Sequence, residues 1–312
     1  MKVIISRKGF DSSAGNMASP ILPDGRIISL PIPTSHDKTT WADIEVSNGL
    51  DLAELVSHLR GQKADAENLN TIHMDPDLNR RKSSRLEGWR PALGQVNGSQ
   101  THLENHEIQV GDVFLFFGWF REVELIGGRW CYKKHAPNIH LLFGWLEIGS
   151  IHHLANHQAS DFSLGIQQHV HIVDLERYNQ DYKGKNTLYV AKEHSKYLEN
   201  SFGGGCFSYW SPQLQLTKKG YGRSFWQLPA WFKPEGRQPL SHHSKENRWM
   251  DDKDSIEHVY WSSCAGHFYL RIFILQWAHP IVGCMRPFKI VIMNELRDFL
   301  FNSVFIHSRS VT

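Results

Sequence analysis

The 312-residue chain lacks the cysteine patterns that mark zinc ribbons and disulfide-rich domains. Its four cysteines are Cys131, Cys206, Cys264 and Cys284. They are widely spaced and form no C-x-x-C pair, so neither a structural zinc site nor a disulfide framework is expected. A reducing, cytoplasmic setting fits this cysteine content best.

Long hydrophobic runs and a strong charge bias are also missing. The longest apolar stretch, 272–285, is interrupted by Gln276, His279 and Pro280 and falls short of the roughly 18 residues that a spanning helix needs. The apolar run at residues 1–5 is too short for a signal peptide, so we expect no membrane segment. With 34 Lys and Arg against 32 Asp and Glu, only a local basic patch could bind nucleic acid.

Hydrophobic and aromatic residues are plentiful. They make up 41% and 12% of the chain, and there are 11 tryptophans, so a single globular domain with a large core and a ring-lined pocket is feasible. Residues 110–120 and 141–149 are short apolar runs bounded by glycine and rich in β-forming residues, which predicts two strands buried on both faces. A Gly127-Gly128 turn separates them.

This strand pair predicts an α+β fold that is mainly β, with a PUA-like small β-barrel core near residues 108–150. Such barrels often hold one nucleobase in an aromatic pocket. Further strands are expected at 2–6, 186–191 and 214–217, a hairpin turn at Asp24-Gly25, and a helix from Asp51 to Gly61. We expect one domain over residues 1–262 and an atypical tail over 263–312, in which a short helix would begin at Asn294.

Several stretches resemble the bacterial nucleotide-modification-associated domain family of the third type. They cover roughly residues 1–259 and lie at 1–15, 73–78, 89–95, 110–120, 186–191, 203–207, 216–217 and 223–232. The resemblance implies an association with hypermodified DNA bases, because members are thought to occur beside genes for such bases. The pattern stops near Cys264, where a reading-frame change would account for the loss.

A base-binding pocket is the first candidate site. Trp119, Phe120 and Trp145 could act as stacking platforms, while Asp112 or Gln95 could contact the polar edge of a base. The alternative is that these rings only fill the core. The full set of expected nucleotide-binding residues is Arg7, Lys8, Ser12, Arg90, Gln95, Trp119, Phe120, Arg223 and Ser224.

Basic loops form the second candidate. Arg80, Arg81 and Lys82 are expected to contact phosphate, helped by Arg85, Lys218 and Lys219, if these loops meet at one rim of the barrel. The alternative is a solvated charged face. The expected partners are therefore DNA or a modified nucleotide, and other base-modification enzymes.

Asp11, Asp75 and Cys206 are the candidates for a chemical role. Cys206 follows three glycines and could act as a nucleophile if a neighbouring group lowered its pKa. His73-x-Asp75-x-Asp77 has the alternation that places three ligands on one face of an extended segment, yet it lacks a distant ligand motif. We therefore predict no metal site, and expect Asp75 to cap a helix or turn. No cofactor can be named from the sequence.

The function expected from these observations is recognition of a modified or flipped nucleotide in DNA base hypermodification. Two alternatives stay open: an enzyme that transforms the modified base, and a structural subunit of a modification or restriction complex. New nucleoside masses would identify an enzyme, and salt-sensitive binding without a mass change would identify a reader.

Overall fold

The computed structural model describes the side chains of most of the first 230 residues. The described residues are 1–12, 14–44, 46, 49–61, 71–78, 85–198, 201–229, 232 and 249–251, with the backbone alone at 258–262 and 272–276. The helix expected from Asn294 therefore lies outside the described residues. Among the helices of the described part, none is long and apolar enough to cross a membrane.

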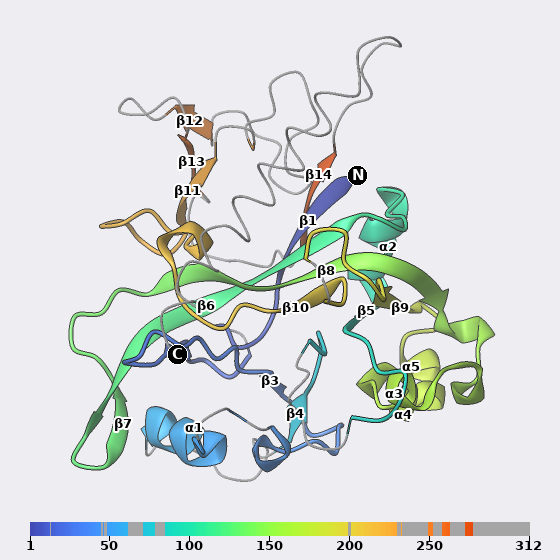
Figure 1. The fold of residues 1–312 in the computed structure, drawn as a ribbon, viewed down its shortest axis with the longest axis horizontal. Coiled ribbons are helices and arrows are strands. Elements are labelled where there is room, and N and C mark those ends of the chain that lie inside the picture. The colour runs from blue at the N-terminus through green and yellow to red at the C-terminus, as the bar shows by residue number, and fades with distance from the viewer. Residues whose placement is uncertain are drawn as a thin grey trace.

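A mixed β-sheet forms the centre of the molecule (Figure 1). Its main path runs in the order β14, β1, β6, β8, β9, β5, and only the β1–β6 pair on this path is parallel. The bounds of these strands are β1 Lys2–Arg7, β5 Ala92–Val96, β6 Val113–Ile126, β8 Ile139–His153, β9 Asn186–Ala191 and β14 Ile272–Gln276. The predicted strands at the N-terminus and at 186–191 are confirmed.

The PUA-like barrel is not confirmed, because this mixed sheet is not closed into a barrel. The two apolar runs do pair as antiparallel strands, β6 with β8. However, β1 adds to the far edge of β6 and β9 to the far edge of β8, so the sheet extends outward in both directions. A barrel needs its first and last strands to pair. The expectation of a mainly β protein is correct.

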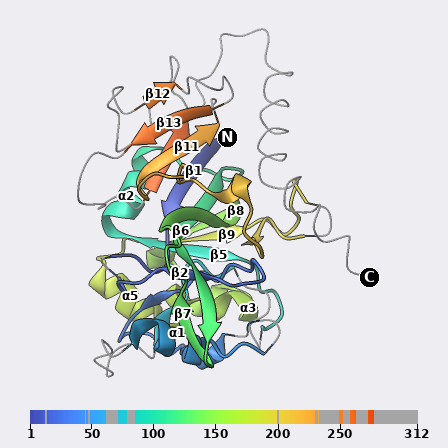
Figure 2. The same cartoon turned by 90° about the vertical axis from the view of Figure 1, so that its left-hand side faces the viewer.

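Shorter strands extend the sheet or form small sheets beside it. β2 (Ser19–Ile21) and β7 (Arg129–Tyr132) pair with β6, and β10 (Gly204–Cys206) pairs with β8. A three-stranded sheet has the order β11 (Phe225–Pro229), β13 (His258–Ser262), β12 (Trp249–Asp251), and β3 (Ile32–Pro33) pairs with β4 (Ile72–His73). The three-stranded sheet lies on the opposite side of the central sheet from α1 (Figure 2).

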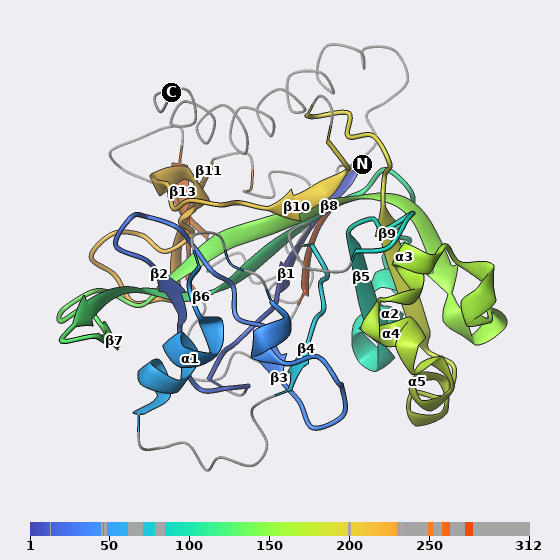
Figure 3. The same ribbon diagram turned by 60° about the horizontal axis from the view of Figure 1, so that its bottom comes forward.

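Five α-helices occur in the described part, with bounds α1 Leu52–Arg60, α2 Asn97–Asn105, α3 Leu164–Gln167, α4 Val170–Val173 and α5 Leu175–Asp181. α1 is the helix predicted from its cap: the Asp51 carboxylate accepts a hydrogen bond from Glu54 N at 3.0 Å. The short helices α3 to α5 gather beside β5 and β9 (Figure 3). They are one or two turns long, which gives too few residues for a clear helical period in the sequence.

One predicted strand, at 214–217, is wrong. A 3-10 turn, Pro212–Leu214, begins this segment, and only isolated bridges join Gln215 to Leu141 and Thr217 to Trp226. The alternating pattern of Leu214 and Leu216 arises because both side chains are buried in the core. Alternation alone does not show that the backbone has a strand partner.

The core is built around the phenylalanines of β6. Phe114, Phe116, Phe117 and Phe120 are fully buried. A strand with apolar residues on both faces needs cover on both faces. The structure supplies it on one side with Trp226, which lies 5.0 Å from Phe117 between ring centroids.

Candidate functional site

A group of buried ionisable side chains lies beneath the central sheet, on the side of β3 and β4. We call Lys8, Asp37, His73, Asp75, His169 and His171 together the Asp75 cluster. The Asp75 side chain is 4% exposed and that of His169 is 2% exposed. Because charged and polar groups are costly to bury, this cluster is an unusual feature that calls for an explanation.

Four separate segments position these side chains, and one of them is the chain after β3, which carries Asp37. Lys8 directly follows β1, and His73 ends β4 two residues before Asp75. His169 is the residue before α4, and His171 is within that helix. The cluster therefore exists only once the sheet and the short helices have packed together.

Asp75 is held by groups from two different segments. Its Oδ2 forms an ion pair with Lys8 Nζ at 2.8 Å, and its Oδ1 accepts a hydrogen bond from Gly94 N at 2.6 Å. Burial by itself would raise the pKa of Asp75, but the Lys8 ammonium and neighbouring groups hold it well below its usual range. Asp75 is thus a carboxylate at neutral pH. It contacts a distant strand, so the expectation that it caps a local helix or turn is wrong.

Two histidines beside Asp75, His73 and His171, are each oriented by an acceptor on the outer side of the ring. His73 Nδ1 lies 2.6 Å from Asp37 Oδ2, and His171 Nδ1 lies 2.7 Å from Asn186 Oδ1. Burial lowers the pKa of His171 to about 3, which keeps its ring neutral. In the neutral ring, an Nδ1–H that donates to Asn186 leaves a lone pair on Nε2.

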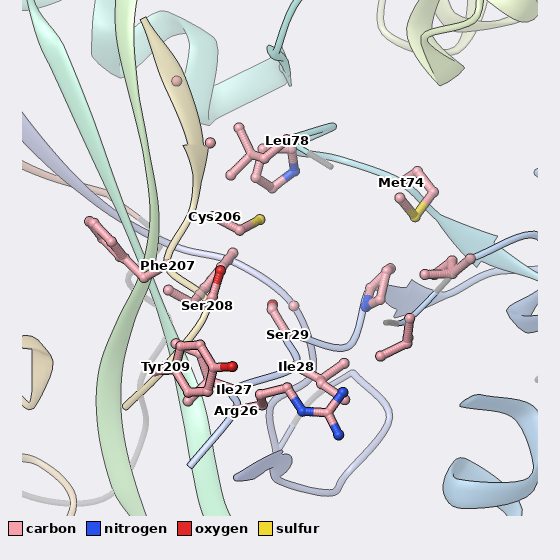
Figure 4. Close-up of a pocket in the computed structure, with 18 of the residues that line it drawn as sticks. Arg26, Ile27, Ile28, Ser29, Met74, Leu78, Cys206, Phe207, Ser208 and Tyr209 are labelled. Atoms are coloured by element: carbon pink, nitrogen blue, oxygen red, sulfur yellow. The ribbon is translucent and has the colours of Figure 1, made fainter. Parts of the chain in front are cut away.

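A pocket of about 400 Å³ adjoins the cluster. Residues 26–29, 74–78 and 204–209 supply most of its lining, and Asp75 is one of the lining residues. Figure 4 shows the Cys206 sulfur directed from β10 toward Leu78 and Met74 across the pocket. This volume lies within the range of small-molecule sites. Cys206 is exposed as a residue, but desolvation of its sulfur by the surrounding atoms and the Asp77 carboxylate raise the pKa of the thiol, which disfavours the thiolate.

Four residues expected in one site do come together, on the opposite side of the central sheet from Lys8. Arg7 and Lys8 are consecutive, so their side chains leave an extended chain in opposite directions. Arg7 pairs with Asp11 at 2.8 Å, and the Arg223 guanidinium lies 4.2 Å from the Trp119 ring centroid. Burial, and then the charge of Arg7, lower the pKa of Arg223, so the two arginines are close enough to interact. We call Arg7, Asp11, Trp119 and Arg223 the arginine–tryptophan site.

The other expected residues are dispersed. Phe120 is fully buried against Phe143, and Gln95 is buried in β5. Arg90 donates to the Ala191 carbonyl at 3.4 Å, and Ser12 is exposed in the loop after β1. Trp145 and Asp112 are buried too: Trp145 packs on Tyr197, and Asp112 accepts from Lys2 N at 2.6 Å.

The expected phosphate contacts cannot be compared with the structure, because Arg80, Arg81 and Lys82 lie outside the described residues. Ser224 is half-buried beside Arg223.

Arg85 pairs with both oxygens of Asp77, and its guanidinium lies 4.3 Å from the Trp89 ring centroid. Asp77 therefore faces Arg85, although its spacing had suggested a shared face with His73 and Asp75.

Sequence reasoning missed Asp37, His169 and His171. The signal available for two of them was the His169-x-His171 spacing within a histidine-rich stretch. With 19 histidines in the chain, that spacing alone does not distinguish a site from chance. Asp37 carries no local signal, because its relation to His73 depends on the pairing of β3 with β4.

Gly94 gives a test of how tightly the cluster is built. A Cβ on Gly94 would overlap the His171 ring, so alanine there must displace that ring. We expect Gly94→Ala to lower the free energy of unfolding by about 1–3 kcal/mol, the usual cost of overpacking. Urea unfolding would measure it. A matched Gly98→Ala change, where a Cβ meets no atom within 4 Å, should cost less, and equal losses would contradict the tight packing.

A buried histidine–carboxylate cluster beside a pocket is the arrangement of an enzyme or a ligand-binding domain. The sequence profile of the family described as nucleotide modification associated domain 3 matches residues 2–263. The chain belongs to this family, as the resemblance predicted, and so to proteins associated with nucleotide modification. No curated protein and no solved structure matches the chain.

Proposed function

We propose that this protein is a nucleotide-modifying enzyme. Its substrate occupies the pocket between residues 26–29, 74–78 and 204–209, and the chemistry takes place at the Asp75 cluster. The observation that carries the proposal is the burial of Asp75 with Lys8 and three histidines at the edge of that pocket. The family supplies the nucleotide as the substrate class.

The energetics support a functional role for the cluster. A core position filled by a well-packed apolar side chain is usually at least as stable as one filled by a buried ion pair. Lys8 and Asp75 form such a pair, and His73 and His171 stand next to it. Titratable groups perturbed by burial and by each other are concentrated at active sites.

The side chains suit acid–base work. Asp75 is ionised and the His171 ring is neutral, so both side chains can accept a hydrogen bond from a substrate group. The Lys8 ammonium is positioned to stabilise negative charge near Asp75. Cys206 would contribute a thiol at the pocket wall, since its raised pKa leaves little thiolate for nucleophilic attack.

The test is nucleoside analysis after incubation with substrate. Purified protein is incubated with DNA that contains modified bases and with free nucleotides, and the nucleosides are then measured by mass spectrometry. We expect a new nucleoside mass with wild type and a loss of about 100-fold or more in its rate of formation with Asp75→Asn, the scale of general acid–base catalysis. The exposed His194→Gln serves as the control variant. A product that forms equally fast with Asp75→Asn would refute the role of the cluster.

The arginine–tryptophan site supports a second candidate, a module that binds a nucleotide without changing it. Arg7 pairs with the Asp11 carboxylate there, and Arg223 already stacks on Trp119, as it could stack beside a base. In this case nucleoside masses stay unchanged. Binding of a short single-stranded oligonucleotide should weaken with salt, and weaken further in Arg223→Gln.

A further inference from the structure

We infer that the Asp75 cluster binds one divalent transition-metal ion, with His73, Asp75 and His171 as its protein ligands. One potential ligand atom from each of these residues lies within 4.8 Å of the other two. The inference concerns the same cluster as the proposed function but does not depend on it, because binding of the metal alone tests it.

The orientation of the two histidines matches that of metal ligands. A metal-binding histidine usually donates its second ring N–H to a carboxylate or carbonyl oxygen, which fixes the ring. His73 Nδ1 meets the buried Asp37 carboxylate, and His171 Nδ1 meets the Asn186 amide oxygen. Each ring would therefore offer Nε2 to the metal. Asp37 and Asn186 would act as positioning residues.

His169 gives an independent indication that a ligand is needed. Its Nδ1 accepts from His171 N at 3.3 Å, so Nε2 carries the proton in the neutral ring. Nε2 has no hydrogen-bond partner in the described part of the chain, and it points at Asp75 Oδ1 from 3.6 Å. An ion with three protein ligands retains water, and such a water would give this buried N–H an acceptor.

The charges around the cluster also favour a cation. Ion pairs connect Asp37 through Arg177 to two further carboxylates, Asp174 and Asp181. The Asp174 and Asp181 side chains are about half exposed, so the buried carboxylates that a cation would meet are Asp37 and Asp75.

The ligand types indicate the class of metal. Two imidazoles and one carboxylate are typical of zinc, iron(II) and other first-row divalent ions, whereas magnesium and calcium prefer oxygen ligands alone. Lys8 shares Asp75 with the proposed ion, so the ammonium and the metal would compete for that carboxylate.

The direct test uses metal salts as probes. Full-length protein, stripped with a chelator, is titrated with Co²⁺ in visible absorption and with Zn²⁺ in calorimetry. We expect one equivalent of either ion to bind and visible Co²⁺ bands from a site that includes nitrogen ligands. The inference would be overturned if neither signal appears. It would also be overturned if several equivalents of the ion bind with similar affinity.

Variants separate this site from adventitious surface binding. His73→Gln and His171→Gln should each weaken binding at least tenfold, and Asp37→Asn should weaken it about tenfold through the orientation of His73. The exposed His194→Gln should bind like wild type. His73 is the variant of choice because its side chain is 21% exposed, so the fold tolerates its loss best. Circular dichroism checks each variant, and unchanged affinity in a folded His73→Gln would refute the assignment.

The Lys8→Met variant distinguishes a metal site from a Lys8–Asp75 ion pair that has only a structural role. If the metal and the ammonium compete for Asp75, this variant should bind Co²⁺ at least as tightly as wild type. If Asp75 serves only to pair with Lys8, the variant should lose stability and bind no metal. Metal binding without any nucleoside product would leave this inference standing while removing the proposed enzyme, and a nucleoside product from a protein that binds neither Co²⁺ nor Zn²⁺ would do the reverse.

Discussion

Lowering the pH from 7 to 5 is expected to destabilise this protein by about 4 kcal/mol, with about 2 kcal/mol from each of two buried histidines. The first is His140 of β8, which is 2% exposed. Burial, and then the charges of Arg223 and Arg7, hold its pKa well below the usual value. The second is His171, whose pKa burial lowers to about 3.

The sign follows from proton uptake. In the unfolded chain a histidine takes up a proton as the pH falls through about 6.5, whereas these two rings stay neutral in the fold. The unfolded state therefore gains protons that the folded state does not bind, and stability falls with pH from about 6.5 downward. For His171 the loss continues to a pH of about 3.

A hydrogen bond also fits the neutral state of the His140 ring. Trp226 Nε1 donates to His140 Nδ1 at 3.0 Å, and a proton on Nδ1 would place two donors against each other. Phe117 packs against both rings, so neither can turn away easily.

Urea unfolding at pH 7, 6 and 5, with a chelator present, would measure the effect. His140→Gln keeps an acceptor for Trp226 but no longer titrates, so about half of the pH dependence should disappear. The exposed His194→Gln should leave it unchanged. Equal stability at pH 7 and pH 5 in wild type would contradict the buried, neutral state of these histidines.

The second large effect is expected at Glu147, a fully buried carboxylate of β8. It pairs with Lys192 Nζ at 2.7 Å and Lys196 Nζ at 3.2 Å. Changing both lysines to methionine would leave this carboxylate buried without a counter-charge. Breaking a buried ion pair in this way costs about 3–5 kcal/mol, and we expect that loss in the free energy of unfolding.

A third substitution distinguishes the charge from simple packing. Adding Glu147→Leu to the Lys192→Met, Lys196→Met variant removes the unpaired charge, so most of the lost stability should return. Lys133→Met is the matched control, because the Lys133–Glu122 pair lies at the surface and should contribute little. If Glu147→Leu fails to restore stability, the long lysine stems and not the ion pairs hold residues 192–196 on the sheet.

The two expected regions of function lie on opposite sides of the central sheet. The arginine–tryptophan site lies on the side of Trp226, and the Asp75 cluster with its pocket lies on the side of β4. From the sequence, Arg7 and Lys8 were expected in one loop and thus in one site. In the structure, β1 continues through Arg7, and the side chains of consecutive residues in an extended chain point to opposite faces of the sheet. Arg7 and Lys8 therefore belong to different sites.

The sequence by itself determined the parts of this protein that depend on neighbours along the chain. Residues 110–120 and 141–149 predicted strands because continuous apolar runs need burial on both faces, and Asp51 marked the start of α1 because its carboxylate caps the following turn. The stretches that resemble the family predicted membership correctly. Each of these signals is local.

Only the tertiary structure decided how the sheet ends and where the cluster forms. A pair of strands has the same local sequence pattern in an open sheet and in a barrel. Here the sheet stays open because β1 pairs with the outer edge of β6 and β9 pairs with the outer edge of β8. His73 and His171 are 98 positions apart in numbering (171 − 73), and they meet because β4 and α4 pack together. Contacts between distant segments depend on the packing of whole elements, and no spacing within either segment records that packing.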